Sequence, residues 1–202
     1  MITIGPGAAL LPGDAHADEA ALLEELRRVA VAAPFRHMVT RGGHAMSVAM
    51  TNCGPLGWVS DRRGYRYAPT DPESGAAWPA MPAAFLRLAG AAAGRAGYAD
   101  FEPDACLINR YEPGAKMGMH QDQDESDFGQ PIVSVSLGLN ATFLFGGRRR
   151  SDPVRKIELS HGDVVVFGGE SRLNYHGVQA LKPGHHPRLG PVRINLTFRR
   201  AA

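Results

Sequence analysis

Short apolar stretches separated by glycine, proline and aspartate dominate the second half of the chain. After Asp104 they predict eight strands, over residues 106–111, 116–121, 132–137, 142–145, 156–159, 164–167, 175–178 and 194–199. Many short strands joined by tight turns are typical of a sandwich or a jelly roll. The pattern therefore predicts a mainly β fold with flanking helices, an α+β protein whose core is a sandwich or a jelly roll.

Two stretches in the first half have the spacing of amphipathic helices. Leu22, Leu26 and Val29 recur at i, i+4 and i+7, which predicts a helix over about residues 14–33, with Asp14 or Asp18 as its N-cap. A second helix is expected over about residues 82–96. The first helix is expected to serve packing and to take no part in chemistry, and Phe85, Leu88 and Ala92 mark the buried face of the second.

The segment between the helices, residues 41–81, has no long periodic pattern. It carries three aromatic residues near one another, Trp58, Tyr65 and Tyr67. Such a segment is either an irregular β-hairpin lid or a set of loops, and segments of this kind often carry function.

Composition limits the class of protein without identifying a partner. The 202 residues suit one domain with a sizeable core, and the 44% apolar and 21% charged residues argue against wholesale disorder. The formal net charge of +2 is too near balance to indicate a nucleic-acid partner. The short basic runs Arg62–Arg63 and Arg148–Arg150 are typical of solvated loops, with contacts to phosphate as the alternative.

Cysteine usage and hydropathy predict an intracellular location. Cys53 and Cys106 are the only cysteines, and no C-x-x-C motif is present, so a reducing, cytoplasmic setting is expected. The first residues do not resemble a secretory signal, and no apolar run reaches 18 residues, so no contact with a membrane is expected.

The segment His120-Gln121-Asp122 is the sharpest candidate for a metal site. Side chains at i and i+2 of a strand point the same way, so His120 and Asp122 can reach one ion. With His176 they would form the two-histidine, one-carboxylate triad of non-haem iron(II) oxygenases. Taken alone, H-x-D occurs often by chance, and a lone histidine is more often structural. The last strand strengthens the assignment.

That last strand has one apolar and one polar face. Alternation places Ile194, Leu196 and Phe198 on one side and Arg193, Asn195, Thr197 and Arg199 on the other. On the outside of the fold the polar face would be ordinary solvated surface. Facing the interior it would need a buried anion, and a dicarboxylate answers that need, with Arg199 as the clamp on its far carboxylate.

The strand over residues 106–111 offers a matching face. Leu107, Asn109 and Tyr111 share one side, and Asn109 and Tyr111 could donate hydrogen bonds to the same acid. The alternative is a strand whose polar face meets solvent.

Together with longer stretches, these residues resemble the AlkB family of DNA-repair dioxygenases, and its bacterial members in particular. The matching stretches are residues 46–54, 103–111, 120–125, 131–139, 161–166, 168–172 and 193–199. The resemblance covers nearly the whole chain and is weakest before Pro34. Gln123 and Phe167 depart from it, because lysine and tryptophan are common at those positions.

The resemblance implies a double-stranded β-helix core that uses Fe(II), 2-oxoglutarate and O2. It also implies one domain over residues 1–202, with helical support over about 14–33 and a nucleotide-recognition lid over about 40–70. The implied catalytic metal ligands are His120, Asp122 and His176. The implied 2-oxoglutarate contacts are Asn109, Tyr111, Arg193, Asn195 and Arg199.

The resemblance further implies a substrate site. Trp58 would stack on a flipped base with the ring of His120 on its other side. Further substrate contacts are expected from Thr40, Met50, Tyr65, Asp124, Glu125 and Arg150. Without the resemblance, Trp58 and Tyr65 would be interpreted as hydrophobic packing under a loop, and Asp124 and Glu125 as a solvated acidic turn. As functional groups, the two carboxylates would favour bases that methylation has made cationic.

The expected activity is oxidative demethylation of bases such as 1-methyladenine and 3-methylcytosine in DNA, a direct-reversal repair that releases formaldehyde, succinate and CO2. The expected partner is alkylated single- or double-stranded DNA, with RNA as an alternative, and the expected state is a monomer. Two other hypotheses remain. One is an oxygenase acting on RNA, a protein side chain or a metabolite. The other is a non-catalytic jelly-roll module, which predicts the loss of a ligand or anchor that this chain retains.

Overall fold

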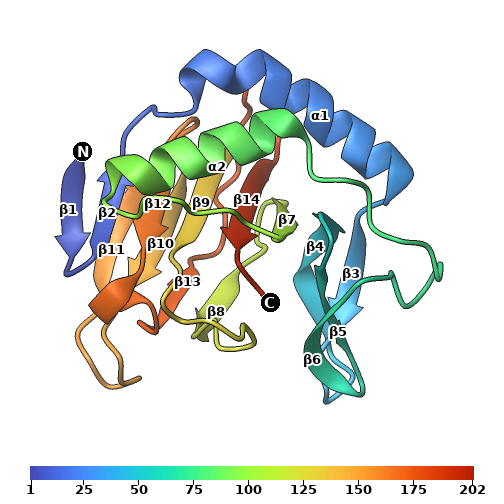
Figure 1. The fold of residues 1–202 in the computed structure, drawn as a ribbon. Coiled ribbons are helices and arrows are strands. Elements are labelled where there is room, and N and C mark those ends of the chain that lie inside the picture. Colours follow the sequence, from blue (N-terminus) through green and yellow to red (C-terminus); the bar gives the residue numbers. More distant parts are fainter.

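Two facing antiparallel sheets form the body of the computed structural model, which describes residues 1–202 (Figure 1). The larger sheet has the order β1 (Ile2–Gly5), β2 (Ala8–Leu11), β12 (Val164–Phe167), β9 (Ile132–Gly138), β14 (Arg193–Arg199), β7 (Ala105–Tyr111), β4 (Ala45–Cys53) and β3 (Arg36–Val39). The smaller sheet has the order β11 (Arg155–Leu159), β10 (Ala141–Phe145), β13 (His176–Val178) and β8 (Met117–His120). This arrangement confirms the predicted mainly β fold with a jelly-roll core.

The eight strands predicted after Asp104 are all present, as β7 to β14, and each end lies within one residue of its predicted position. Residues 41–81, for which hairpin and loops were both open, contain strands. β4 pairs with β3, and β5 (Gly57–Asp61) pairs with β6 (Gly64–Ala68) as a separate two-stranded hairpin. These four strands stand together on the right of Figure 1.

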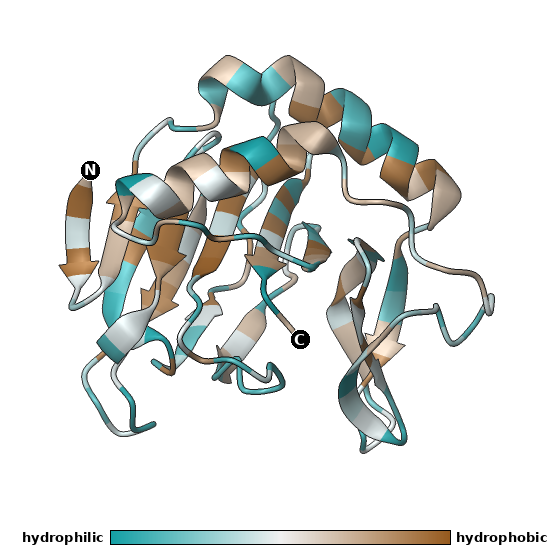
Figure 2. Cartoon of the chain, viewed as in Figure 1, coloured by the Kyte–Doolittle hydropathy of each residue, from teal (hydrophilic) through white to brown (hydrophobic).

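Two helices, α1 (Glu19–Ala32) and α2 (Ala83–Arg95), lie side by side across one face of the larger sheet (Figure 1). Both carry hydrophobic positions between hydrophilic ones along their length (Figure 2). The first helix has Asp18 at its N-cap, the later of the two expected starts, because residues 16–18 form a short 3-10 turn before it. A second such turn follows β12 at Gly169–Ser171. No helix has both the length and the hydropathy needed to cross a membrane.

The alternation along β14 divides the core into two layers. Ile194, Leu196 and Phe198 pack with α1 and α2 in the cluster under the helices. Arg193 and Arg199 face the opposite way, into a pocket shared with the smaller sheet. All seven residues of β14 are buried, so the solvated-surface interpretation of its polar face is wrong. The charged face lies inside the roll, where it needs counter-charges.

Three histidines stack where the N-terminal segment meets the loop before β14. The ring of His161 lies 4.3 Å from that of His186 and 5.7 Å from that of His16, measured between centroids. Gly138 N–H donates to His161 Nδ1 at 2.9 Å, and His161 Nε2 lies 3.2 Å from Glu19 Oε1. Burial lowers the pKa of His161, His186 and His16 lower it further, and Glu19 opposes them.

We expect this stack to make the protein lose stability in mild acid. Because the pKa of His161 is lower in the folded protein than in the unfolded chain, the folded state binds fewer protons. The stabilisation is therefore present above the unfolded pKa of about 6.5 and is lost as the pH falls below it. The thermal stability of wild type relative to His161→Asn should fall between pH 7.5 and pH 5.5. His185→Asn, at an exposed position in the loop that carries His186, controls for the loss of a surface imidazole. A wild-type advantage that is equal at both pH values would contradict the expectation.

Candidate metal and co-substrate site

Pairing between β8 and β13 brings two imidazoles together. His176 lies directly opposite His120 in the antiparallel register, and the ring centroids are 4.4 Å apart. The close approach depends on Gly177, because a Cβ at that position would lie 2.7 Å from the carbonyl oxygen of Met117. Residues 56 positions apart in the sequence thus become neighbours through one cross-strand pair.

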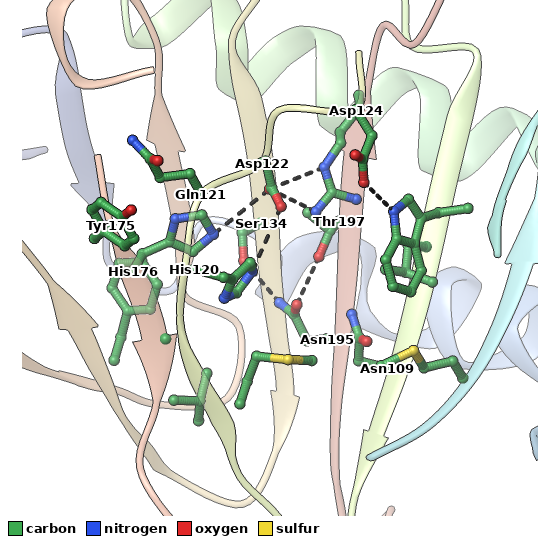
Figure 3. Close-up of a pocket in the computed structure, with 18 of the residues that line it drawn as sticks. Asn109, His120, Gln121, Asp122, Asp124, Ser134, Tyr175, His176, Asn195 and Thr197 are labelled. Atoms are coloured by element: carbon green, nitrogen blue, oxygen red, sulfur yellow. Dashed lines mark hydrogen bonds and ion pairs between the residues drawn. The ribbon is translucent and has the colours of Figure 1, made fainter. Parts of the chain in front are cut away.

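Asp122 completes a cluster of three potential ligands just beyond the end of β8 (Figure 3). Its Oδ1 lies 3.6 Å from His120 Nε2, and its Oδ2 lies 3.6 Å from His176 Nε2. One ligand atom from each residue lies within 4.8 Å of the others. Two histidines and one carboxylate at this spacing suit a non-haem iron(II) site.

Backbone contacts orient both imidazoles for metal binding. His120 Nδ1 lies 2.8 Å from the carbonyl oxygen of Gly118, and His176 Nδ1 lies 3.0 Å from that of Asn174. A carbonyl oxygen can only accept, so each Nδ1 carries the hydrogen and each Nε2 keeps its lone pair. Both Nε2 atoms face Asp122, so the lone pairs of the two imidazoles and the carboxylate can bind the same metal ion.

The charges around Asp122 keep it ionised. Burial raises the pKa of this carboxyl, but Arg199 and the two histidines more than offset that effect and hold it well below its usual range. Burial lowers the pKa of His176, helped by the nearby His120. For His120, burial lowers the pKa but the contacts with Asp122 prevail and raise it. An ionised carboxylate is the form that binds a divalent cation.

Arg193 is a buried guanidinium without a carboxylate partner. It is 1% exposed, and only Nη2 donates a hydrogen bond, to Ser136 Oγ at 3.0 Å, whereas Nε and Nη1 have no partner. Its guanidinium lies 5.0 Å from the centre of the Tyr111 ring, and burial lowers its pKa. The Oδ1 of Asn109 is also buried and unpaired. An anion with a forked carboxylate would satisfy the free side of Arg193.

Arg199 occupies a different position from the one expected of it. Its Nη2 and Nε lie 2.7 and 3.1 Å from Asp122 Oδ2, so it sits beside the metal ligands. Of the two arginines expected to contact 2-oxoglutarate, Arg199 is paired with Asp122, whereas Arg193 has a free side. Asn195 also differs from expectation. Its Nδ2 already donates to Ser134 Oγ at 2.8 Å and to Val135 O at 3.0 Å, which leaves no hydrogen for a co-substrate.

The pocket above the cluster has a volume of about 320 Å³. Among the expected substrate contacts, Met50, Trp58, Tyr65, Asp124 and Arg150 line it. Trp58 and Tyr65 stack at 5.5 Å between ring centroids, and Trp58 Nε1 donates to Asp124 Oδ2 at 2.8 Å. Tyr65 is 51% exposed, so hydrophobic packing under a loop does not describe it.

Two expected substrate contacts lie outside the pocket lining. Thr40 is half-buried, and its Oγ1 accepts from the N–H of His44 at 3.2 Å. Glu125 is neither at the pocket mouth nor in a solvated turn, because its side chain is 2% exposed and pairs with Arg172 at 3.0 Å and Arg199 at 3.3 Å. These two guanidinium groups hold the carboxylate inside the protein.

The residues around the site that sequence reasoning missed are Ser134, Ser136, Tyr67 and Arg172. The two serines alternate with Val133 and Val135 on β9, so the period of two could have placed them on the inward face. Arg172 follows a short 3-10 turn and has no periodic signal.

Comparison with known proteins agrees with this chemistry. The model of the 2OG-Fe(II) oxygenase superfamily matches residues 7–199. An alpha-ketoglutarate-dependent dioxygenase AlkB from Salmonella typhimurium is 59% identical over 98% of this chain and 92% of its own length. The chain belongs to the AlkB family of 2OG-Fe(II) oxygenases.

Other AlkB-type proteins extend the comparison. The structure of OsALKBH1 superimposes with a TM-score of 0.86 at 32% identity, covering 98% of both chains. The DNA N(6)-methyladenine demethylase ALKBH1D of Arabidopsis thaliana is 43% identical over 48% of this chain and 24% of its own length.

This AlkB-family chain is an alpha-ketoglutarate-dependent dioxygenase, and its cofactors are Fe(II), 2-oxoglutarate and O2. The residues present suit those groups. The imidazole and carboxylate cluster offers ligands for the iron, and the unpaired side of Arg193 offers a partner for the dicarboxylate.

Proposed function

We propose that this protein removes N-alkyl groups from nucleic-acid bases by oxidation, as a direct-reversal repair of lesions such as 1-methyladenine and 3-methylcytosine in DNA. One observation carries the proposal. The aromatic surface of Trp58 and the carboxylate of Asp124 line the same pocket as the His120, Asp122 and His176 cluster. An aromatic plate and a negative charge beside a metal site suit a flat, cationic substrate.

The buried residues would hold the metal and the co-substrate. His120, Asp122 and His176 would bind Fe(II) and leave three positions of an octahedral ion open. Arg193 would bind the distal carboxylate of 2-oxoglutarate, with Asn109 and Tyr111 beside it, and Arg199 would face the carboxylate nearer the metal. When bound, Fe(II), 2-oxoglutarate and O2 would supply the oxidation that turns an N-methyl into an N-hydroxymethyl group. That group would leave the base as formaldehyde, and 2-oxoglutarate would be converted to succinate and CO2.

The pocket residues would bind and select the base. A ring methyl group inside a duplex is out of reach, so the base must be flipped out or already single-stranded. Trp58 would stack on it and Met50 would line the wall of the pocket, while Asp124 would favour 1-methyladenine and 3-methylcytosine because both carry a positive charge. Exposed Arg150, 4.9 Å from the Tyr175 ring, would contact a phosphate.

The surrounding segments would support this site. We assign residues 40–70 as a nucleotide-recognition lid, because the β5–β6 hairpin carries Trp58 and Tyr65 to the pocket. Residues 14–33 would act as helical support within a single domain. We further propose that the protein works as a monomer in the cytoplasm.

We expect the protein to release formaldehyde and succinate in equal amounts from a single-stranded oligonucleotide with one 1-methyladenine, given Fe(II), 2-oxoglutarate and air. Mass spectrometry of the oligonucleotide would follow the restored adenine. The neutral lesion 1-methylguanine, in the same sequence, should react more slowly.

Asp124→Asn is the matched charge control, because its amide oxygen can still accept from Trp58. It should reduce the preference for the cationic lesion by up to about fivefold, the range expected for an exposed charge. Faster repair of the same lesion in RNA would show that RNA, not DNA, is the preferred substrate. Failure to restore any base would reject the proposal.

A further inference from the structure

A buried carboxylate beneath the metal cluster has no role in the proposed function. Glu125 Oε1 accepts a hydrogen bond from Tyr67 at 2.6 Å and lies 3.3 Å from Arg199 Nε. Glu125 Oε2 lies 3.0 Å from Arg172 Nη2. The side chains of Glu125, Arg172 and Arg199 are 2%, 3% and 7% exposed, so water does little to weaken these contacts.

Arg172 extends the network to the backbone of a metal ligand. Its Nη1 donates to the carbonyl oxygen of Asp122 at 2.9 Å, and its Nε donates to that of Gln130 at 3.0 Å. Glu125 therefore holds the arginine that fixes the main chain of Asp122. Through Arg199 it also holds the arginine that contacts the Asp122 side chain.

We propose that Glu125 is a positioning residue that, through Arg172 and Arg199, fixes Asp122 for the metal and Arg199 for 2-oxoglutarate. The assignment rests on the proposed function for the identity of the two ligands. It also ties the lid to the site, because Tyr67 on β6 donates to the same carboxylate.

The balance of buried charge supports this role. Asp122 and Glu125 face Arg172 and Arg199, so two carboxylates match two guanidinium groups. Without the Glu125 charge, Arg172 loses its only carboxylate and becomes an unpaired buried cation. Arg199 keeps only Asp122, so it competes more strongly with a metal for that carboxylate. The metal ion and 2-oxoglutarate are then both expected to bind less tightly.

Glu125→Gln tests the proposal, because it keeps the size of the side chain and removes its charge. The matched control is Asp71→Asn. Asp71 accepts two hydrogen bonds from Arg36, at 2.6 and 2.7 Å, and is 11% exposed, but it lies outside the site. Both variants should lower the melting temperature. Only Glu125→Gln should weaken Mn²⁺ binding, and 2-oxoglutarate binding to the Mn²⁺-loaded protein, each by about tenfold, as for other groups that orient metal ligands.

The direction of the change in 2-oxoglutarate affinity distinguishes a positioning role of Glu125 from a purely electrostatic one. A purely electrostatic role would weaken binding of the cation and strengthen binding of the 2-oxoglutarate dianion, because the variant makes the site more positive. Tighter 2-oxoglutarate binding, or unchanged binding of both ligands, would overturn the proposal. These binding measurements do not depend on demethylation, so their failure is distinguishable from a failure of the proposed function.

Tyr67→Phe keeps the proposal testable if Glu125→Gln does not fold. It removes one hydrogen bond from Glu125 and no charge. Tyr98→Phe is its control, because Tyr98 donates one hydrogen bond to Gly7 O at 2.7 Å, away from the site. Tyr67→Phe should weaken 2-oxoglutarate binding by about threefold, in the range of one net hydrogen bond. Equal affinities in the two phenylalanine variants would count against the proposal.

Discussion

Replacing Arg193 by methionine is expected to raise the thermal stability of the ligand-free protein and to abolish its stabilisation by 2-oxoglutarate. The guanidinium is buried with two nitrogens unpaired, so an apolar side chain of similar length removes a desolvated charge. By analogy with the replacement of other buried charges, the gain is about 1–2 kcal/mol, or about 3–6 °C for a chain of this size. The affinity for 2-oxoglutarate should fall by about 10²-fold, because its carboxylate would lose a buried cationic partner.

Thermal melts with and without 2-oxoglutarate, in the presence of Mn²⁺, would measure both effects. Arg155→Met is the control, because Arg155 is exposed and donates to a backbone carbonyl, that of Ile4, at 2.8 Å. It should melt in the ligand-free state no higher than wild type and keep the full response to 2-oxoglutarate. An Arg193→Met protein that 2-oxoglutarate stabilises as much as wild type would show that the dicarboxylate binds elsewhere.

Asp122→Asn is expected to lower turnover by about 10³-fold, because the neutral amide is a poor ligand and several kcal/mol of metal-dependent stabilisation are lost. The amide oxygen can still accept from Arg199, so the fold should survive. The primary measurement is Mn²⁺ affinity by electron paramagnetic resonance, followed by formaldehyde release with Fe(II).

Asp124→Asn is the companion variant, because it removes a charge two residues away without touching the cluster. It should bind Mn²⁺ nearly as wild type does. If Asp122→Asn retained wild-type Mn²⁺ affinity, the assignment of Asp122 as a ligand would be wrong.

The local patterns of the sequence predicted the strands and the faces that they bury. Each strand from β7 to β14 has a run of apolar or alternating residues bounded by turn residues, and this is short-range information. The same period of two placed Arg193 and Arg199 on one face. The lid remained open between hairpin and loops because residues 41–81 lack a sustained period, and pairing between β5 and β6 decided the outcome.

Depth within the site could not be predicted in the same way. Alternation fixes the face of a residue but not which end of the strand lies beside the metal ligands, so the pairing of Arg199 with Asp122 could not be predicted. The burial of Glu125 depends on Arg172, 47 residues away, and on Tyr67, 58 residues away. Partners so far away in the sequence produce no periodic pattern around Glu125. Asp124 and Glu125 therefore had a solvated acidic turn as one interpretation.

The place of β8 in the smaller sheet has a consequence for metal loading. β8 is an edge strand with β13 as its only neighbour, and one of the two residue pairs between them is the pair of histidines. An ion held there would link β8 to β13 at the edge of the sheet, where β8 has only one neighbouring strand. Release of the ion would then be coupled to local opening of β8. The amides of residues 117–122 should therefore exchange with solvent faster in the metal-free protein than in the metal-loaded protein.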